Sequence, residues 1–92
     1  MEISDIRIRK VLSGDKRLKA IVSITIDNLV AVHDIKVIKG DDRLFVAMPS
    51  RKDENGTYRD IIHPITAPAR QKLEESILSA YEDYINSLPT EQ

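Results

Sequence analysis

The chain of 92 residues has no cysteine and no tryptophan, and aromatic residues make up only 4% of it. The lack of cysteine excludes disulfide bonds, thiolate metal sites and a cysteine nucleophile, and it fits a reducing compartment. No apolar run approaches the roughly 18 residues that a membrane span needs, and the N-terminus lacks a signal-peptide pattern. We therefore expect a cytoplasmic protein with no membrane partner and no cofactor, and a core that is built from aliphatic side chains.

The length of the chain allows one hydrophobic core. Ninety-two residues are too few for two independent domains, so we expect a single domain over residues 1–88 and a flexible tail over residues 89–92. A chain of this size buries only about two-thirds of its unfolded surface. Association with a second copy would therefore help to stabilise it.

The formal net charge of −1 hides an uneven distribution. Residues 1–39 hold eight Lys and Arg against five Asp and Glu (+3), and residues 40–72 hold six against five (+1). Residues 73–92 hold no basic residue against five acidic ones (−5). An acidic C-terminal segment thus masks a basic remainder, which is compatible with a local patch that binds anions.

Three stretches in the first half of the chain have the alternation of β-strands, over about residues 2–12, 18–26 and 29–38. Short turn-forming segments at residues 13–15, 27–28 and 39–42 separate them from one another and from the next strand. Connections this short favour an antiparallel meander.

The stretch from Leu44 to Ile65 predicts a hairpin that carries positive charge. A strand over residues 44–48 ends at Pro49, a polar loop follows over residues 50–57 with Asn55-Gly56 at its centre, and a second strand over residues 58–62 ends at His63-Pro64. The loop and the returning strand carry three cations: Arg51, Lys52 and Arg59.

After Pro64 the apolar period changes to that of an α-helix. One stripe contains Leu73, Ile77, Ala80, Tyr81, Tyr84, Ile85 and Leu88. Thr66 can cap the start of this helix, and Pro68 is tolerated in its first turn. We therefore predict an α+β fold, with an antiparallel sheet of four to five strands and one C-terminal helix packed on it. One helix covers one face, so an exposed edge or face is expected to form a homodimer.

The chain resembles the SpoVG family of bacterial septation regulators (stage V sporulation protein G). The resemblance covers about residues 2–85, and its most specific blocks are 48–52, Gly56, 58–61 and 63–65, with further matches at 5–10, 18–20 and 32–38. It implies a small homodimer that binds DNA, or RNA in some members, and acts in asymmetric septation, sporulation and the control of surface or virulence genes. The loop departs from the family, because Asp53-Glu54-Asn55-Gly56 stands where a Thr-Pro-Asp-Gly type segment is usual.

The main candidate site for nucleic acid is the set Arg51, Lys52 and Arg59. Guanidinium groups can contact phosphates or the edge of a guanine in the major groove, which a two-stranded ribbon can enter. The alternative is a solvated hairpin in which Arg59 pairs with Asp53 or Asp60. Tyr58 could stack on a base, although cross-strand packing is the commoner role.

Two further groups of cations are secondary candidates. Lys16 and Arg17 flank the first turn, near Lys19 and the outward cations of the first strand, Arg7, Arg9 and Lys10. Arg70 and Lys72 stand early in the helix, where a cation opposes the helix dipole. Phosphate contacts would explain both groups, and ordinary surface charge or protection of a strand edge is the alternative.

The pairs His33-Asp34 and Asp60 with His63 raise the question of a metal site or an enzyme. Adjacent strand residues point to opposite faces, so His33 and Asp34 are not expected to share a site. The sequence has no serine-nucleophile motif and no glycine-rich phosphate loop. We expect no catalytic or metal site, and we expect both histidines to form hydrogen bonds within the sheet or at its end, while Asp34 or Asp60 holds an arginine.

Three functions follow as alternatives. The first is a DNA-binding regulator of transcription, septation or cell division that uses Arg51, Lys52 and Arg59, helped by Lys16, Arg17 and Arg70. The second is a dimeric adaptor that binds a regulatory or division protein through its sheet edge. The third is an RNA-binding regulator, which the low aromatic content makes less suited to stacking on single strands.

Overall fold

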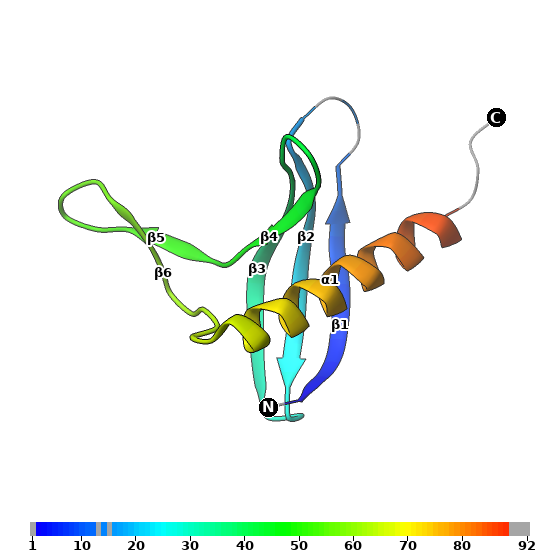
Figure 1. Cartoon of the computed structure of the whole chain (residues 1–92), viewed down its shortest axis with the longest axis horizontal. Helices are drawn as coiled ribbons and strands as arrows, with labels where there is room; N and C mark the ends of the chain where they lie inside the picture. Colours follow the sequence, from blue (N-terminus) through cyan, green and yellow to red (C-terminus); the bar gives the residue numbers. More distant parts are fainter. Residues whose placement is uncertain (1, 13, 15, 89–92) are drawn as a thin grey trace.

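A computed structural model describes residues 2–12, 14 and 16–88. Its main element is an antiparallel sheet in the order β1-β2-β3-β4, formed by β1 (Ile3–Val11), β2 (Leu18–Ile26), β3 (Val30–Lys39) and β4 (Leu44–Ala47) (Figure 1). This confirms the predicted meander. The predicted tail, residues 89–92, lies outside the described residues.

The turn between β2 and β3 fixes the register of the two strands. Asp27 and Asn28 both have positive φ angles, 52° and 58°, and the amide of Leu29 donates to the carbonyl of Ile26 at 2.9 Å. Two successive positive φ angles characterise the type I′ turn, whose twist matches that of the strands it joins. Short polar residues tolerate this conformation, which is why Asp-Asn occupies the turn.

The helix α1 (Ala67–Ser87) crosses one face of the sheet (Figure 1). Its cap is the predicted one, because Thr66 Oγ1 accepts the amide proton of Ala69 at 3.1 Å, and Pro68 lies in the first turn. Leu73 and Ile77 are the fully buried members of the predicted stripe and join a core of aliphatic side chains from β2, β3 and β4. The predicted α+β fold is confirmed. No helix among the described residues has the length and apolar character to cross a membrane.

The predicted pairing of residues 44–48 with 58–62 is wrong. The strand β4 pairs with β3 instead, from Lys36↔Ala47 to Lys39↔Leu44, and so completes the main sheet. Beyond Pro49 the chain forms a separate ribbon, in which β5 (Ser50–Lys52) pairs with β6 (Tyr58–Asp60). Proline has no amide proton to continue a ladder, and the polar residues after it have no core to join. Figure 1 shows this ribbon projecting away from the sheet.

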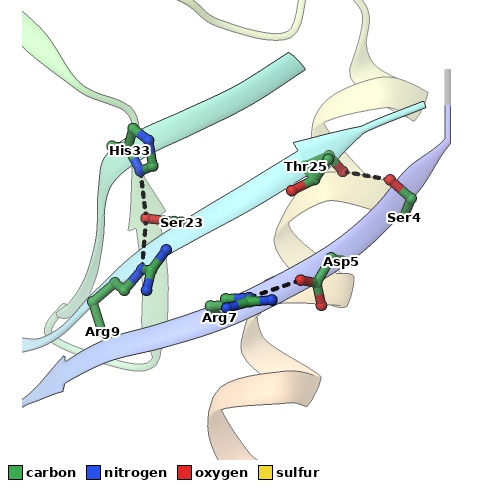
Figure 2. A network of polar contacts seen from close by, with 7 residues as sticks. All are labelled: Ser4, Asp5, Arg7, Arg9, Ser23, Thr25 and His33. Carbon is green, nitrogen blue, oxygen red and sulfur yellow. Dashed lines mark hydrogen bonds and ion pairs between the residues drawn. The ribbon is translucent and has the colours of Figure 1, made fainter. Parts of the chain in front are cut away.

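The face of the sheet opposite α1 carries a polar network (Figure 2). Ser23 is buried at its centre, where its Oγ lies 2.8 Å from Nδ1 of His33 and accepts from Nε of Arg9 at 3.3 Å. Beside it, Arg7 is ion-paired with Asp5 at 2.9 Å. Two of the outward cations of β1 therefore have partners within this face, which reduces their availability for phosphate contacts.

The strict strand alternation expected at His33 and Asp34 is interrupted. The pairing of β2 with β3 shifts between Val22↔Ile35 and Ile24↔Val32, so both residues stand opposite Ser23 in a β-bulge. Both are exposed, and Asp34 has a φ of 63°. The bulge inserts one residue into the alternation, and the sequence carries no glycine to mark it.

Candidate nucleic-acid interface

The ribbon places its cations on both of its faces. Residues that stand directly opposite each other in an antiparallel pair share a face, and here Arg51 is opposite Arg59, and Lys52 is opposite Tyr58. All four side chains are exposed, and Tyr58 is 69% exposed despite its cross-strand neighbour. One face of the ribbon therefore presents two guanidinium groups, and the other an ammonium group beside a phenol ring.

The loop of the ribbon is held by Asp53. Its Oδ1 accepts the amide protons of Asn55 at 2.9 Å and Thr57 at 3.0 Å, and its backbone amide donates to the carbonyl of Thr57 at 2.9 Å. Gly56 has a φ of 83°, a region that favours glycine. The predicted Asn55-Gly56 turn is present, but within the described loop only Gly56 has a positive φ. The loop is accordingly of the longer type, in which a turn is followed by a left-handed glycine.

The second oxygen of the same carboxylate binds Arg59. Nε of Arg59 donates to Oδ2 of Asp53 at 2.8 Å. This hydrogen bond is the main reason that the pKa of Asp53 lies below its ordinary value, and the backbone amide of Thr57 lowers the pKa further. Of the two acids that the sequence offered as partners, the structure selects Asp53; no ion pair joins the described Arg59 and Asp60.

The other two cations of the ribbon, Arg51 and Lys52, differ from Arg59. Within the described ranges 2–12, 14 and 16–88, neither Arg51 nor Lys52 takes part in an ion pair or a side-chain hydrogen bond. They line an open concavity together with Arg59, Ile61 and three acids, Asp53, Glu54 and Asp60. An anion that approached this concavity would meet accessible cations without first breaking ion pairs of Arg51 or Lys52.

The structure places Lys16 and Arg17 elsewhere, at the end of the sheet where the β1–β2 and β3–β4 connections meet. Nε of Arg17 donates to the carbonyl of Lys39 at 3.0 Å, and its Nη2 lies 3.9 Å from Oδ1 of Asp41. Lys16 is exposed. Asp41 and the neighbouring acid reduce the local positive charge here, and Arg17, unlike Arg51 and Lys52, already has an acidic partner among the described residues.

A third location holds Arg70. It lines a hollow beside the first turns of α1 with Arg43, Glu74 and Glu75. Arg43 also lines the hollow that contains Arg17, so it links the two secondary groups. We did not predict Arg43 from the sequence, because it stands alone in the connection before β4, and only the fold shows its neighbours.

The two histidines serve separate local roles. Nδ1 of His63 lies 3.0 Å from the carbonyl of Pro64, and His33 contacts Ser23 as described. The expected hydrogen bonds of both histidines are therefore confirmed. The expected arginine partner of Asp34 or Asp60 is not found among the described ion pairs. The acids that pair with arginines there are Asp5, Asp41 and Asp53. No group of three or more potential metal ligands gathers among the described residues.

Comparison with known proteins gives one consistent result. Residues 1–83 match the family model described as SpoVG. The chain is 57% identical over 82 residues to a protein of Desulforudis audaxviator (strain MP104C), covering 89% of this chain and 92% of that protein. It is 51% identical over 92 residues to a protein of Clostridium botulinum (strain Alaska E43 / Type E3), covering 100% of both chains. It is 57% identical over 83 residues to a protein of Clostridioides difficile (strain 630), covering 90% of this chain and 89% of that one. Each of these relatives is named "Putative septation protein SpoVG". The matched region includes the four-stranded sheet, the ribbon and most of α1, and the chain belongs to the SpoVG family.

Proposed function

We propose that this protein is a cytoplasmic regulator of septation or a sporulation-related process that binds duplex DNA through the β5–β6 ribbon. Membership of the SpoVG family and the septation names of its relatives support the process. The separate, protruding ribbon with its exposed cations supports DNA as the ligand.

The observation that carries the proposal is the pairing of Arg51 with Arg59. Like charges directly opposite each other destabilise a strand pair, and a ribbon of only three residues per strand has little other stabilisation. The bond from Arg59 to Asp53 offsets part of this repulsion, but Arg51 has no anionic partner among the described residues, so the stability of the ribbon explains at most one of the two arginines. An anionic ligand would explain both, because it would bind the two cations at once and remove the repulsion between them.

The β5–β6 ribbon is a two-stranded antiparallel element, and the major groove of B-form DNA admits an element of this kind. Arg51 and Arg59 would contact phosphates or guanine edges from one face. Lys52 would contact phosphates from the other face, next to the exposed ring of Tyr58. Arg70, Lys16 and Arg17 lie outside the ribbon, and any contribution from them would be an additional phosphate contact where the DNA extends past it.

A second copy of the chain is part of this proposal, because a dimer would present two ribbons to two half-sites. The chain exposes 6915 Å², whereas a compact monomer of its 10.4 kDa mass exposes about 5,400 Å². The projecting ribbon contributes to this excess of about 1,500 Å², and a standard interface buries roughly 800 Å² of each partner. The monomer thus has ample surface for a dimer.

Both edges of the main sheet are poorly suited to strand pairing between copies. The register of β1 with β2 shifts at Ser4 and at Arg9, and β1 carries several charges, so its edge is irregular and charged. At the other edge, Oε2 of Glu74 accepts the amide proton of Val46 at 3.3 Å. These features favour an apolar surface over a strand edge as the dimer contact.

Such a surface exists beside the start of α1. An apolar groove is lined by Ile26, Val32, Ile62, Pro64 and Leu73 among others. Two apolar residues close in sequence to the lining are each 85% exposed: Leu29, in the turn between β2 and β3, and Ile65, directly after Pro64. Burial of these side chains against a second copy would remove large apolar groups from water.

The proposal is tested by fluorescence anisotropy with a mixed-sequence duplex DNA, a matched RNA and a salt series. The wild type is compared with Arg51→Ala/Lys52→Ala/Arg59→Ala and with a control of equal charge change, Lys10→Ala/Lys36→Ala/Lys39→Ala, whose residues are exposed on the main sheet. Each lost phosphate contact on duplex DNA should flatten the slope of log K against log salt by about 0.9. We expect the ribbon variant to lose up to about 2.7 of this slope and the control to keep it.

Absence of binding by the wild type at low salt would refute DNA binding and favour the protein-adaptor function. Equal losses in the ribbon variant and the control would show that binding follows net charge, and would refute the ribbon as the site. Tighter binding of the RNA than of the duplex would refute DNA as the ligand.

A further inference from the structure

We propose that Asp53 is a positioning residue for Arg59: it holds the guanidinium so that its two outer nitrogens face a ligand with paired acceptor atoms. On duplex DNA the paired acceptors are O6 and N7 of guanine, or two oxygens of one phosphate. This inference rests on the proposed function, because it names the part of the ribbon that would recognise the DNA.

The two oxygens of Asp53 have different partners. Oδ1 accepts the amides of Asn55 and Thr57, and Oδ2 accepts Nε of Arg59. The carboxylate is half-buried, with its side chain 25% exposed, whereas the Arg59 side chain is 74% exposed. Asp53 is therefore fixed to the backbone of the loop and in turn fixes a side chain that projects into solvent.

The contact uses only one edge of the guanidinium. Among the described residues, Nη1 and Nη2 of Arg59 have no ion pair or hydrogen bond. Arginine has five N–H donors in a planar fork, so binding through Nε leaves the four donors of the two outer nitrogens available. These nitrogens have the spacing that matches a pair of acceptor atoms.

The ion pair also reduces the cost of ordering Arg59. A long arginine side chain loses rotamer entropy when it is immobilised. The bond to Asp53 restricts the Arg59 side chain before the ligand arrives. The further entropy that this side chain loses on binding would therefore be smaller. An acid inside a cationic site is then explained, although its charge alone would repel DNA.

The alternative is that Asp53 only closes the loop and lowers the local positive charge. The neighbouring acid Glu54 separates the two explanations. Glu54 is exposed, and no hydrogen bond or ion pair involves its side chain in the described structure. Glu54→Gln and Asp53→Asn remove the same charge from the same loop, but only Asp53→Asn removes the anionic partner of Arg59. Asparagine keeps an oxygen that can accept the amides of Asn55 and Thr57.

The test compares wild type, Asp53→Asn, Glu54→Gln, Arg59→Ala and Asp53→Asn/Arg59→Ala. Each binds two duplexes of equal length, one of G·C pairs and one of A·T pairs, in an anisotropy assay at fixed salt. Amide spectra of Asn55 and Thr57 confirm that the loop is intact in Asp53→Asn.

We expect Glu54→Gln to bind at least as tightly as the wild type, since it loses a repulsive charge, and Asp53→Asn to bind more weakly despite the same charge change. If the ligand atoms are those of guanine, Asp53→Asn loses about fivefold or more of the preference for the G·C duplex. If they are phosphate oxygens, it loses affinity equally on both duplexes. In either case Asp53→Asn no longer weakens binding once Arg59 is alanine, because only the loss of a repulsive charge then remains.

Asp53→Asn binding as tightly as Glu54→Gln would overturn the inference, as would a loss of affinity on Asp53→Asn that persists in the Arg59→Ala background. Neither result contradicts a contact between Arg59 and DNA, so neither contradicts the proposed function. If the wild type does not bind DNA, both the inference and the proposed function are refuted. If Arg59→Ala binds as tightly as the wild type, Arg59 is not a DNA contact and the inference alone loses its basis.

Discussion

The side chain of Asp53 both stabilises the conformation of its loop and binds a cation on the surface of the ribbon. It accepts two amides of its own loop and the Nε of Arg59, which stands directly opposite Arg51. The sequence places two acids, Asp53 and Glu54, beside Arg51 and Lys52 without indicating what either acid contacts. The structure shows that Asp53 bonds both to the loop backbone and to Arg59, and this could not be deduced from charge, because the roles of Oδ1 and Oδ2 depend on the loop conformation.

The lowered pKa of Asp53 gives the loop a defined pH dependence. Because its folded-state pKa lies below the unfolded value, the stabilisation of the loop is complete above about pH 4, and it is lost as the pH falls through the lowered pKa. We expect the amide resonances of Asn55 and Thr57 to shift as Asp53 is protonated, in a spectral titration from about pH 6 to about pH 2.

In Asp53→Asn the shift of these two resonances in that pH range should be lost. A midpoint at or above the ordinary value for aspartate in the wild type would contradict the bond to Arg59.

At the scale of elements, local patterns predicted the strands well and their partners less well. The residues 18–26 alternate so regularly that β2 was bounded correctly, and Thr66 with Pro68 placed the start of α1. The partner of residues 44–48 was misassigned, because Pro49 ends β4 without indicating which strand lies beside it. The partner of β4 is determined by the burial of Val46 and Met48 in the main core, which holds β4 on the sheet.

The packing of α1 on the sheet should contribute measurably to the free energy of unfolding. Ile77 has no exposed surface and packs in the cluster that includes Val22 and Ile35. We expect Ile77→Ala to lower the free energy of unfolding by about 2–5 kcal/mol, and Ile77→Val by about 0.5–1.5 kcal/mol, because each leaves a cavity of different size. Chemical denaturation at one fixed protein concentration measures both. A loss under about 1 kcal/mol for Ile77→Ala would contradict the packing of α1 described here.

At the scale of the whole molecule, the average properties of the chain conceal its surfaces. The net charge is −1, yet the ribbon separates Arg51, Lys52 and Arg59 from the acidic helix. The radius of gyration is 14.0 Å, against about 12 Å for a compact domain of this length. Composition predicted the charge asymmetry, but the extended shape depends on the ribbon leaving the sheet at Pro49.

The proposed dimer predicts a specific sensitivity to charge beside the apolar groove. We expect Leu29→Lys/Ile65→Lys to convert a dimer to a monomer, because lysines in a buried interface lack counter-charges. Leu88→Lys is the control, since Leu88 is 41% exposed at the other end of α1. Sedimentation equilibrium over a concentration series measures the mass, and circular dichroism checks the fold. A monomeric wild type, or a dimer that survives both lysines, would contradict this interface.

The most direct test of the central claim is to observe which amides respond when duplex DNA is added. Isotope-labelled protein is titrated with a short mixed-sequence duplex at low salt, and the backbone amide shifts are followed residue by residue. The account predicts that the largest changes fall in residues 50–60, with smaller changes near Arg43 and Arg70. Changes concentrated around Arg17 or on the open face of the main sheet, with residues 50–60 unaffected, would contradict it.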